Sequence, residues 1–566
     1  MASNGATRSI GPGWLPALAV FALGLAYIER PLLTEGLISG RITDTYIQIA
    51  ILQNWSNCLS GAGTCLAPNY FFPHPSTLGY NDGYLISGLL FHALRLLGFD
   101  PLIAYELVYA TVRLIGFAAT IVLGVRVLAL PLWAAVLAAW LALVSINLLN
   151  QIEHSQMIYA AFLPLGILLL VRLLDSLHRL TEAPGARREA WVNIAAIGVL
   201  SAAWAVTAFY SFFCFFLVSL LFMAAYSALR PQLMGAAIRG LIRHPSVLAA
   251  LVIGAAMTPV AVWTVYGATL MKSGAHPWST GFNPRLFDLF NVGPDNLVWS
   301  RLLAPLYQAL AGTPMVHSEL AVGVPPIVLI GSLAALALLL GWLARRLPGT
   351  ASLRGDHAGL VVALAIAAVL TVAFVLVFGR GTTAWRLLWT VLPGAKAIRV
   401  PARFLVFVTP LTALCLAYVL TRALERISPQ ARIAAIAATF LVLSVEQYHA
   451  NPTFTLPRTS ERAFYDSVPP PPAQCRSFYV SLPRYAQGGS AEMNAYYLHA
   501  VDAMMIAALY RIPTVNGMAS FLPSGWNLTG PFEPDYETRV AAYAQKHGIA
   551  GGLCALQLKP PRWIVR

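Results

Sequence analysis

Long apolar runs, separated by short turns that carry arginine, fill the chain as far as residue 448. A helix needs about 20 mainly apolar residues to cross the hydrocarbon core of a membrane. The pattern therefore predicts about eleven membrane-spanning helices, at residues 13–29, 102–125, 131–149, 157–177, 191–207, 208–228, 246–267, 320–343, 358–378, 403–421 and 433–448. The expected fold class is an all-α polytopic membrane protein with several long outer loops.

The pattern changes after residue 448. Four consecutive prolines at residues 469–472 are typical of a semi-rigid linker. Strands and helices are then predicted at residues 477–482, 493–510, 535–547, 555–558 and 563–565. We therefore expect two domains, a transmembrane domain over 1–448 and a small α+β domain over 449–566.

Composition and charge indicate a membrane setting and an orientation. Apolar residues make up 58% of the chain and charged residues 11%, whereas a soluble protein has about 25% charged residues. The net charge of +14 comes mostly from arginines in alternate, short turns, which the positive-inside rule places in the cytoplasm. The N-terminus is then cytoplasmic in a bacterial inner membrane. The long loops 30–101, 268–319 and 379–402 and the C-terminal domain are periplasmic.

This charge does not indicate nucleic acid as a partner. The sequence has no basic-aromatic platform and no zinc finger. Orientation in the bilayer and contact with membrane lipids explain the basic residues more simply.

The cysteines give an independent check on the orientation. Two of the six lie within apolar runs and are expected to pack as small hydrophobic side chains. The other four lie on the predicted outer side, where disulfides can persist. We expect disulfides between Cys58 and Cys65 and between Cys475 and Cys554, with free thiols as the alternative.

The first outer loop, residues 30–101, is too long to be a mere connector. Apolar positions after Asp44 recur as on a helix that lies at the membrane interface. The Asp44 carboxylate could be the N-cap of that helix or a general base at the membrane surface, and both interpretations stay open. His74, in an aromatic run, and Asp82, in a predicted turn, are candidate substrate-binding residues.

Further ionisable residues lie in other outer loops. Glu153 and His154 are adjacent in a short loop, and Glu319 lies at the outer end of the eighth predicted span. A carboxylate beside an imidazole can contact a substrate, bind a metal or relay a proton. Solvated or capping residues are the alternative, because adjacent side chains rarely bind one ion together.

The last outer loop is strongly basic, against the orientation rule. It and the residues that follow carry Arg380, Lys396, Arg399 and Arg403. Such an exception has a cost in membrane insertion, so a compensating partner is expected. Anionic lipid head groups are one candidate. A phosphate or pyrophosphate ligand is the other, since guanidinium groups form paired hydrogen bonds to phosphate oxygens.

Several short stretches, spread over nearly the whole chain, are similar to the same protein family. They include the acidic residue at a helix start in the first outer loop, and the segments Tyr70–Pro75, Gly79–Asp82, Asp100–Tyr105, Leu392–Phe404 and Pro513–Gly517. Together they resemble a bacterial branch of the GT-C superfamily of integral-membrane glycosyltransferases. The run from Leu392 to Phe404 is the most specific of them.

The resemblance implies an inverting sugar transfer on the periplasmic face. The donor would be a polyprenyl-phosphate sugar, and the acceptor a glycan, lipid or protein. The family's acidic residue of the first outer loop corresponds to Asp44, as general base. Arg399 and Arg403 are four residues apart, so on a helix they would share a face that could grip the donor phosphate. Arg380 and Lys396 are weaker candidates for the same task.

The resemblance also raises the question of a metal. Some relatives use a divalent ion, such as Mg²⁺ or Mn²⁺, bound by acidic residues of several outer loops. Here only Asp44, Glu153, His154 and Glu319 could supply such ligands, and no paired Asp-x-Asp motif is present. Metal dependence therefore stays open.

Two non-enzymatic functions are the alternatives: a lipid or polysaccharide transporter, and an assembly protein on the same scaffold. A transporter typically shows internal repeats and broken spans with polar residues at mid-membrane. Here the polar residues gather in outer loops and no internal repeat is evident. The pattern favours the glycosyltransferase.

Overall fold

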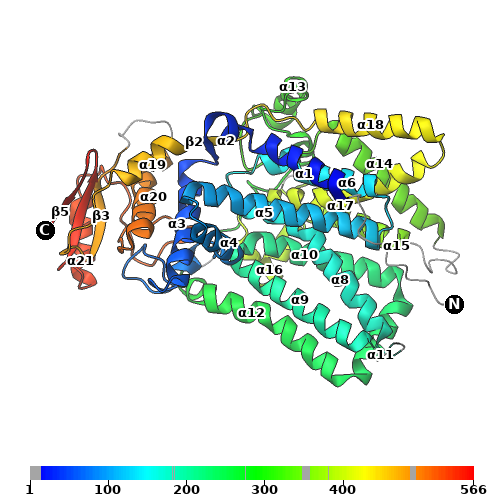
Figure 1. The fold of residues 1–566 in the computed structure, drawn as a ribbon, viewed down its shortest axis with the longest axis horizontal. Helices are drawn as coiled ribbons and strands as arrows, with labels where there is room; N and C mark the ends of the chain where they lie inside the picture. The colour runs from blue at the N-terminus through cyan, green and yellow to red at the C-terminus, as the bar shows by residue number, and fades with distance from the viewer. Residues whose placement is uncertain are drawn as a thin grey trace.

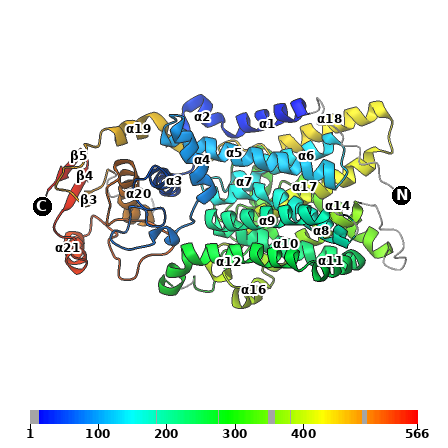
Figure 2. The ribbon, with the colours of Figure 1, turned by 60° about the horizontal axis from the view of Figure 1, so that its bottom comes forward.

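The computed structural model describes residues 14–565 except 182, 184, 274–275, 347–356, 380 and 485–491. Its long helices lie side by side along the long axis of the molecule (Figure 1). A small β-sheet region lies at one end of that axis, where the chain finishes (Figures 1 and 2).

Within the described residues, eight helical segments are long and apolar enough to cross a membrane. They are formed by α5 (Pro101–Val122) with η2 (Leu123–Val127), α6 (Leu132–Leu143) with α7 (Ile146–Leu149), η3 (Ser155–Phe162) with α8 (Leu163–His178) and η4 (Arg179–Thr181), α9 (Ala186–Thr207), α10 (Phe209–Leu229), α12 (Pro245–Ser273), α15 (Ala358–Val375), and η7 (Pro401–Arg403) with α17 (Phe404–Leu424). Shorter apolar helices lie at the remaining expected spans: α1 (Trp14–Ile28), α14 (Pro326–Arg346) and α18 (Pro429–Val445). The predicted helical membrane protein is confirmed, with an apolar helix at every expected span.

Aspartates cap the starts of two helices in this bundle, and one of these caps comes from a distant segment. α5 begins with Pro101 after Asp100, whose carboxylate accepts hydrogen bonds from the next two N–H groups at 3.1 and 3.3 Å. α10 begins directly after α9, and Phe209 N donates to Asp82 Oδ1 at 2.8 Å. The turn that holds Asp82 is thereby fixed against the outer end of the bundle.

The first outer loop is largely helical. It contains α2 (Arg30–Glu35), β1 (Leu37–Ser39), α3 (Ile42–Leu59), η1 (Thr77–Tyr80) and α4 (Leu85–Leu96). The helix expected after Asp44 is α3, and its position at the membrane surface stays a prediction. Residues Thr45 to Asn57 are all buried, because α3 lies between the helix bundle and α20 (Glu492–Tyr510) (Figure 1).

Other short helices connect the bundle. They are α11 (Pro231–Arg243), η5 (Leu286–Phe290), α13 (Ser300–Ala311), α16 (Trp385–Val391) and η6 (Ala395–Ala397). α11 lies at the end of the bundle that is far from the C-terminal sheet (Figure 1).

The C-terminal part combines strands with helices, as predicted. Besides α20 it contains β2 (Phe454–Pro457), α19 (Arg458–Asp466), β3 (Ser477–Leu482), α21 (Tyr536–Lys546), β4 (Leu553–Leu558) and β5 (Pro561–Ile564). β4 is the central strand of a three-stranded sheet, parallel to β3 and antiparallel to β5. β2 instead pairs antiparallel with β1 of the first outer loop. A domain boundary at residue 448 stays a prediction.

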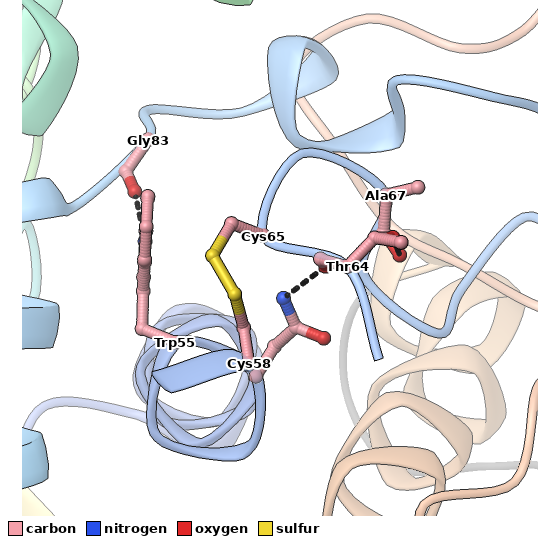
Figure 3. The surroundings of a disulfide bond; sticks show 7 residues. Trp55, Cys58, Thr64, Cys65, Ala67 and Gly83 are labelled. Carbon is pink, nitrogen blue, oxygen red and sulfur yellow. Dashed lines mark hydrogen bonds between the residues drawn. A yellow bond between two sulfur atoms is a disulfide. The ribbon is translucent and has the colours of Figure 1, made fainter. Parts of the chain in front are cut away.

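Both expected disulfides are present. Cys58 and Cys65 join the last turn of α3 to the loop after it (Figure 3), and Cys475 is bonded to Cys554 of β4. Near the first bond, the indole N–H of Trp55 donates to Gly83 O, in the segment just before α4, at 2.6 Å (Figure 3). These contacts fix the far end of the helix that carries Asp44.

Candidate functional site

A cavity of about 1110 Å³ lies where the helix bundle meets the outer segments. Its polar outer end is formed by the start of α3, the turn at 79–84, residues 150–156, Glu319 and the segment 397–403. A loop of the C-terminal part, residues 518–521, closes one side. Ligand sites usually have about 300–1,000 Å³, so this cavity has room for a substrate larger than one sugar.

The inner end of the cavity runs between α9, α10 and α12. Its lining is mainly apolar, with Ile197, Phe212, Phe216, Leu220, Met223, Ala255 and Val262. In the most apolar 18-residue stretch of α12, only 11% is buried inside the protein. Most of that helix therefore faces lipid. The cavity therefore continues from a polar mouth into the depth of the membrane.

Asp44 faces the polar end from the first turn of α3. The N-cap of this helix is Arg41, so the N-cap interpretation of Asp44 is wrong. The Asp44 side chain is 38% exposed, and it lines the cavity. Burial in this enclosed space, followed by the charge of Glu153, raises the pKa of Asp44 to about 6, although Arg403 opposes the shift.

His154 lies among three carboxylates. Its Nδ1 is 3.7 Å from Asp44 Oδ2, and its Nε2 is 3.7 Å from Glu153 Oε1 and 3.6 Å from Glu319 Oε2. Burial, followed by the charge of Arg403, holds the pKa of His154 well below its usual range. At neutral pH the carboxylates therefore surround a neutral imidazole.

Two arginines approach the same cluster from the other side. Arg403 is almost fully buried and donates from Nε (3.0 Å) and Nη2 (2.6 Å) to Glu319 Oε2. Arg399 Nη2 is 3.4 Å from Glu319 Oε1, and its side chain is 57% exposed. The expectation that the two arginines share one helix face is wrong, since Arg399 precedes the short 3₁₀ helix η7 that Arg403 ends. They meet at Glu319 instead.

Asp82 is a second carboxylate in the cavity. It caps α10 through Phe209 N, and it lines the cavity wall. Burial raises the pKa of Asp82 to about 6, while the Phe209 N–H and the charge of Arg403 oppose the shift. Its position follows from the start of α10.

Two expected site residues lie elsewhere. Lys396 points its Nζ at the ring of Trp389, 5.0 Å from the centroid, and does not line the cavity. His74 packs against His547, with ring centroids 5.3 Å apart, in the C-terminal part. Arg380 lies outside the described residues. Of the basic loop, Arg399 and Arg403 alone among the expected residues reach the cavity within the described part of the chain.

The acidic residues do not form a metal site as they are arranged. In the part of the chain that the structure describes, no three His, Cys, Asp or Glu side chains are placed to hold an ion. Glu319 is engaged by Arg403, and Glu153 Oε2 is 3.0 Å from Arg41 Nε. Arginines therefore already pair with two of these carboxylates, and dependence on a divalent ion stays a prediction.

Three cavity residues escaped the sequence analysis. Arg41, next to the first turn of α3, could have been noticed as a cation on the outer side. His276 and Phe521 give no local signal, because each lies in an irregular segment and only the fold brings them into the cavity.

Comparison of sequences finds nothing similar. No family model matches the chain, and no curated protein matches it.

Comparison of structures does find similar folds. An oligosaccharyltransferase from Archaeoglobus fulgidus, tethered with an acceptor peptide containing the NVT sequon, has a TM-score of 0.50 and 11% identity, covering 97% of this chain and 69% of that one. The oligosaccharyltransferase AglB of the same organism, in complex with an inhibitory peptide and a dolichol-phosphate, has a TM-score of 0.48 and 11% identity, covering 95% and 69%. The mycobacterial arabinofuranosyltransferase AftD has a TM-score of 0.47 and 15% identity, covering 90% and 32%.

At these identities the likeness concerns the fold. With the peptide-tethered oligosaccharyltransferase it extends over nearly the whole of this chain. The chain therefore shares the fold of that oligosaccharyltransferase.

Proposed function

We propose that the protein is an inner-membrane glycosyltransferase that moves a sugar from a polyprenyl-phosphate donor to a periplasmic-side acceptor. The acceptor offers a hydroxyl group and is a glycan, a lipid or a protein. The supporting observation is the cavity, which has a carboxylate and two arginines at its outer end and an apolar space between membrane helices at its inner end. An isoprenoid chain is apolar along its whole length, so it matches that inner end.

In this proposal Asp44 is the general base. It takes the proton of the acceptor hydroxyl while the acceptor oxygen forms a bond to the anomeric carbon. The bond from that carbon to the phosphate oxygen breaks on the opposite face, and the electron pair leaves with the polyprenyl phosphate. A carboxylate whose pKa is raised to about 6 is ionised at neutral pH and is a stronger base than an ordinary aspartate.

Arg399 and Arg403 would receive the donor phosphate. Negative charge grows on the leaving phosphate during the reaction, and fixed cations in an enclosed site stabilise it. Arg399 is more than half exposed, so its guanidinium can reach a ligand. Arg403 is held by Glu319 in a fixed direction, which makes Glu319 a positioning residue.

The orientation follows from charge and cysteines. α11, with Arg239 and Arg243, lies at the end of the bundle far from the C-terminal sheet (Figure 1), and arginine-rich turns are expected in the cytoplasm. The cavity mouth, both disulfides and the C-terminal domain are then periplasmic, where disulfides persist.

The test is sugar transfer or hydrolysis by purified protein in lipid nanodiscs, with a panel of polyprenyl-phosphate sugars. We expect Asp44→Asn and Arg399→Ala to abolish turnover while the protein stays folded. Asp466→Asn and Arg426→Ala change exposed residues away from the cavity and serve as matched controls. Near-native turnover in either site variant would show that its assigned role is wrong. Wild-type protein that moves the lipids between leaflets without turnover would support the transporter instead.

A further inference from the structure

The C-terminal part contributes a fixed wall to the cavity. The side-chain amide of Asn81 donates to Met518 O at 3.2 Å and accepts from Ser520 N at 3.2 Å. Phe521 N donates to Tyr80 O, also at 3.2 Å. These three hydrogen bonds hold the loop 518–521 against the turn at residues 79–84 of the first outer loop. Neither segment is a strand.

Two aromatic rings meet on this wall. The rings of Phe521 and His276 are stacked, with centroids 4.7 Å apart and an interplanar angle of 29°. Both side chains are half-buried, and both line the cavity. His276 N donates to Lys396 O at 3.1 Å, which ties the ring pair to the segment that carries Arg399.

The ring pair lies near Arg399, one of the two arginines that the proposed function assigns to the donor phosphate. Burial, followed by the charge of Arg399, lowers the pKa of His276. The imidazole is therefore neutral at neutral pH, and it does not repel the nearby cation. Asn81 and Asp82 also line the cavity, and Asn81 is hydrogen-bonded to the loop that carries Phe521, so hydrogen-bonding groups lie in the same cavity as the rings.

We propose that Phe521, with the His276 ring stacked behind it, forms the binding face for a sugar ring next to the phosphate site. The proposal rests on the proposed function and names which protein groups contact the carbohydrate. A sugar ring has an apolar face of C–H groups and hydroxyl groups around its edge. Aromatic rings match the first, and the Asn81 amide and the Asp82 carboxylate match the second. The sugar is either the one carried by the donor or one at the end of the acceptor.

The donor arm of the test separates contacts to the sugar from contacts to the lipid phosphate. The probes are decaprenyl phosphate esterified with glucose, mannose, galactose or arabinofuranose, and its methyl ester, which carries the same single charge and the same lipid. Affinities are measured with the full chain in nanodiscs. We expect wild-type protein to bind at least one sugar ester more tightly than the methyl ester.

The variants then assign that preference. Phe521→Ala should weaken binding of the preferred sugar ester by about tenfold or more, and should leave binding of the methyl ester unchanged. Phe521→Trp keeps an aromatic face and should retain the preference, which a merely structural role would not predict. Phe378→Ala removes an exposed phenyl ring that does not line the cavity, and serves as the control.

The acceptor arm uses the same variants in transfer to a panel of oligosaccharides. An effect of Phe521→Ala on the acceptor KM alone would assign the face to the acceptor sugar. If Phe521→Ala changes neither the sugar preference nor the acceptor KM, or weakens both esters equally, the proposal is overturned. Wild-type protein that binds neither ester would instead refute the proposed function itself.

Discussion

If Asp44 is the general base, its pKa determines how the rate of transfer depends on pH. Only the ionised carboxylate of Asp44 can take the acceptor proton, and its pKa is raised to about 6. The ionised fraction is then about 90% at pH 7 and about 10% at pH 5. Because the pKa is raised, activity is lost as the pH falls, and kcat/KM should drop about tenfold between pH 7 and pH 5. An ordinary aspartate would show no such loss over this range.

Replacing the charged neighbours of Asp44 should shift the acidic limb of the pH–rate profile in predictable directions. After burial, the negative charge of Glu153 is the largest cause that raises the pKa. Glu153→Gln removes that charge, so the limb should shift to lower pH and more activity should remain at pH 5. Arg403→Ala removes the largest opposing charge and should shift the limb to higher pH, in whatever activity is left.

The assay is the initial rate of transfer by nanodisc-embedded protein from pH 5 to 8, with donor below its KM. Asp82 also has a pKa of about 6, so Asp82→Asn is needed to assign the limb and should leave it in place. His154 should not contribute, because its pKa lies well below this range. A flat profile, or a limb that persists unchanged in Glu153→Gln, would refute the assignment of Asp44.

Three further outcomes are expected. Arg403→Lys keeps the charge but loses the paired geometry, so donor affinity should fall by roughly tenfold in a lipid-binding assay, and unchanged affinity would remove Arg403 from the site. Reducing Cys475–Cys554, a bond across 79 residues, should lower the stability of the C-terminal part by about 4.5 kcal/mol, measured by its thermal unfolding with and without reductant. Arg484 contacts the buried carboxylates of Glu461 and Asp502 at 2.8 and 3.2 Å. Arg484→Met removes this cation and leaves both carboxylates without it. It should cost about 3–5 kcal/mol, and a melting temperature equal to wild type would contradict this.

The membrane part could be predicted because lipid imposes one simple requirement. Every backbone polar group must be satisfied within the segment, so long apolar runs become helices whatever surrounds them. The disulfides could also be predicted, because the two cysteines of each pair lie in the same outer region of the sequence. α3 shows the limit: its sequence indicates a helix, but only the fold shows that α20 covers its other side.

The site was predictable by residue type and less so by geometry. Asp44, Glu153 and Arg399 were singled out because charged groups in outer loops are few, and the structure brings them to one cavity. The sequence contains a signal against a helix through Arg399. Val400 precedes Pro401, and a residue that precedes proline disfavours helical backbone. Val400 has non-helical backbone angles instead, at φ −120° and ψ 79°.

The pairing of β1 with β2 has a consequence for how the molecule is made. A chain is synthesised from its N-terminus, and domains tend to fold as they emerge. β2, which pairs with β1, and α20, which packs on α3, both come from residues after 453, so they are among the last segments to be synthesised. A nascent copy that ends before these residues has the apolar helices of the bundle but not the loop 518–521 that closes one side of the cavity.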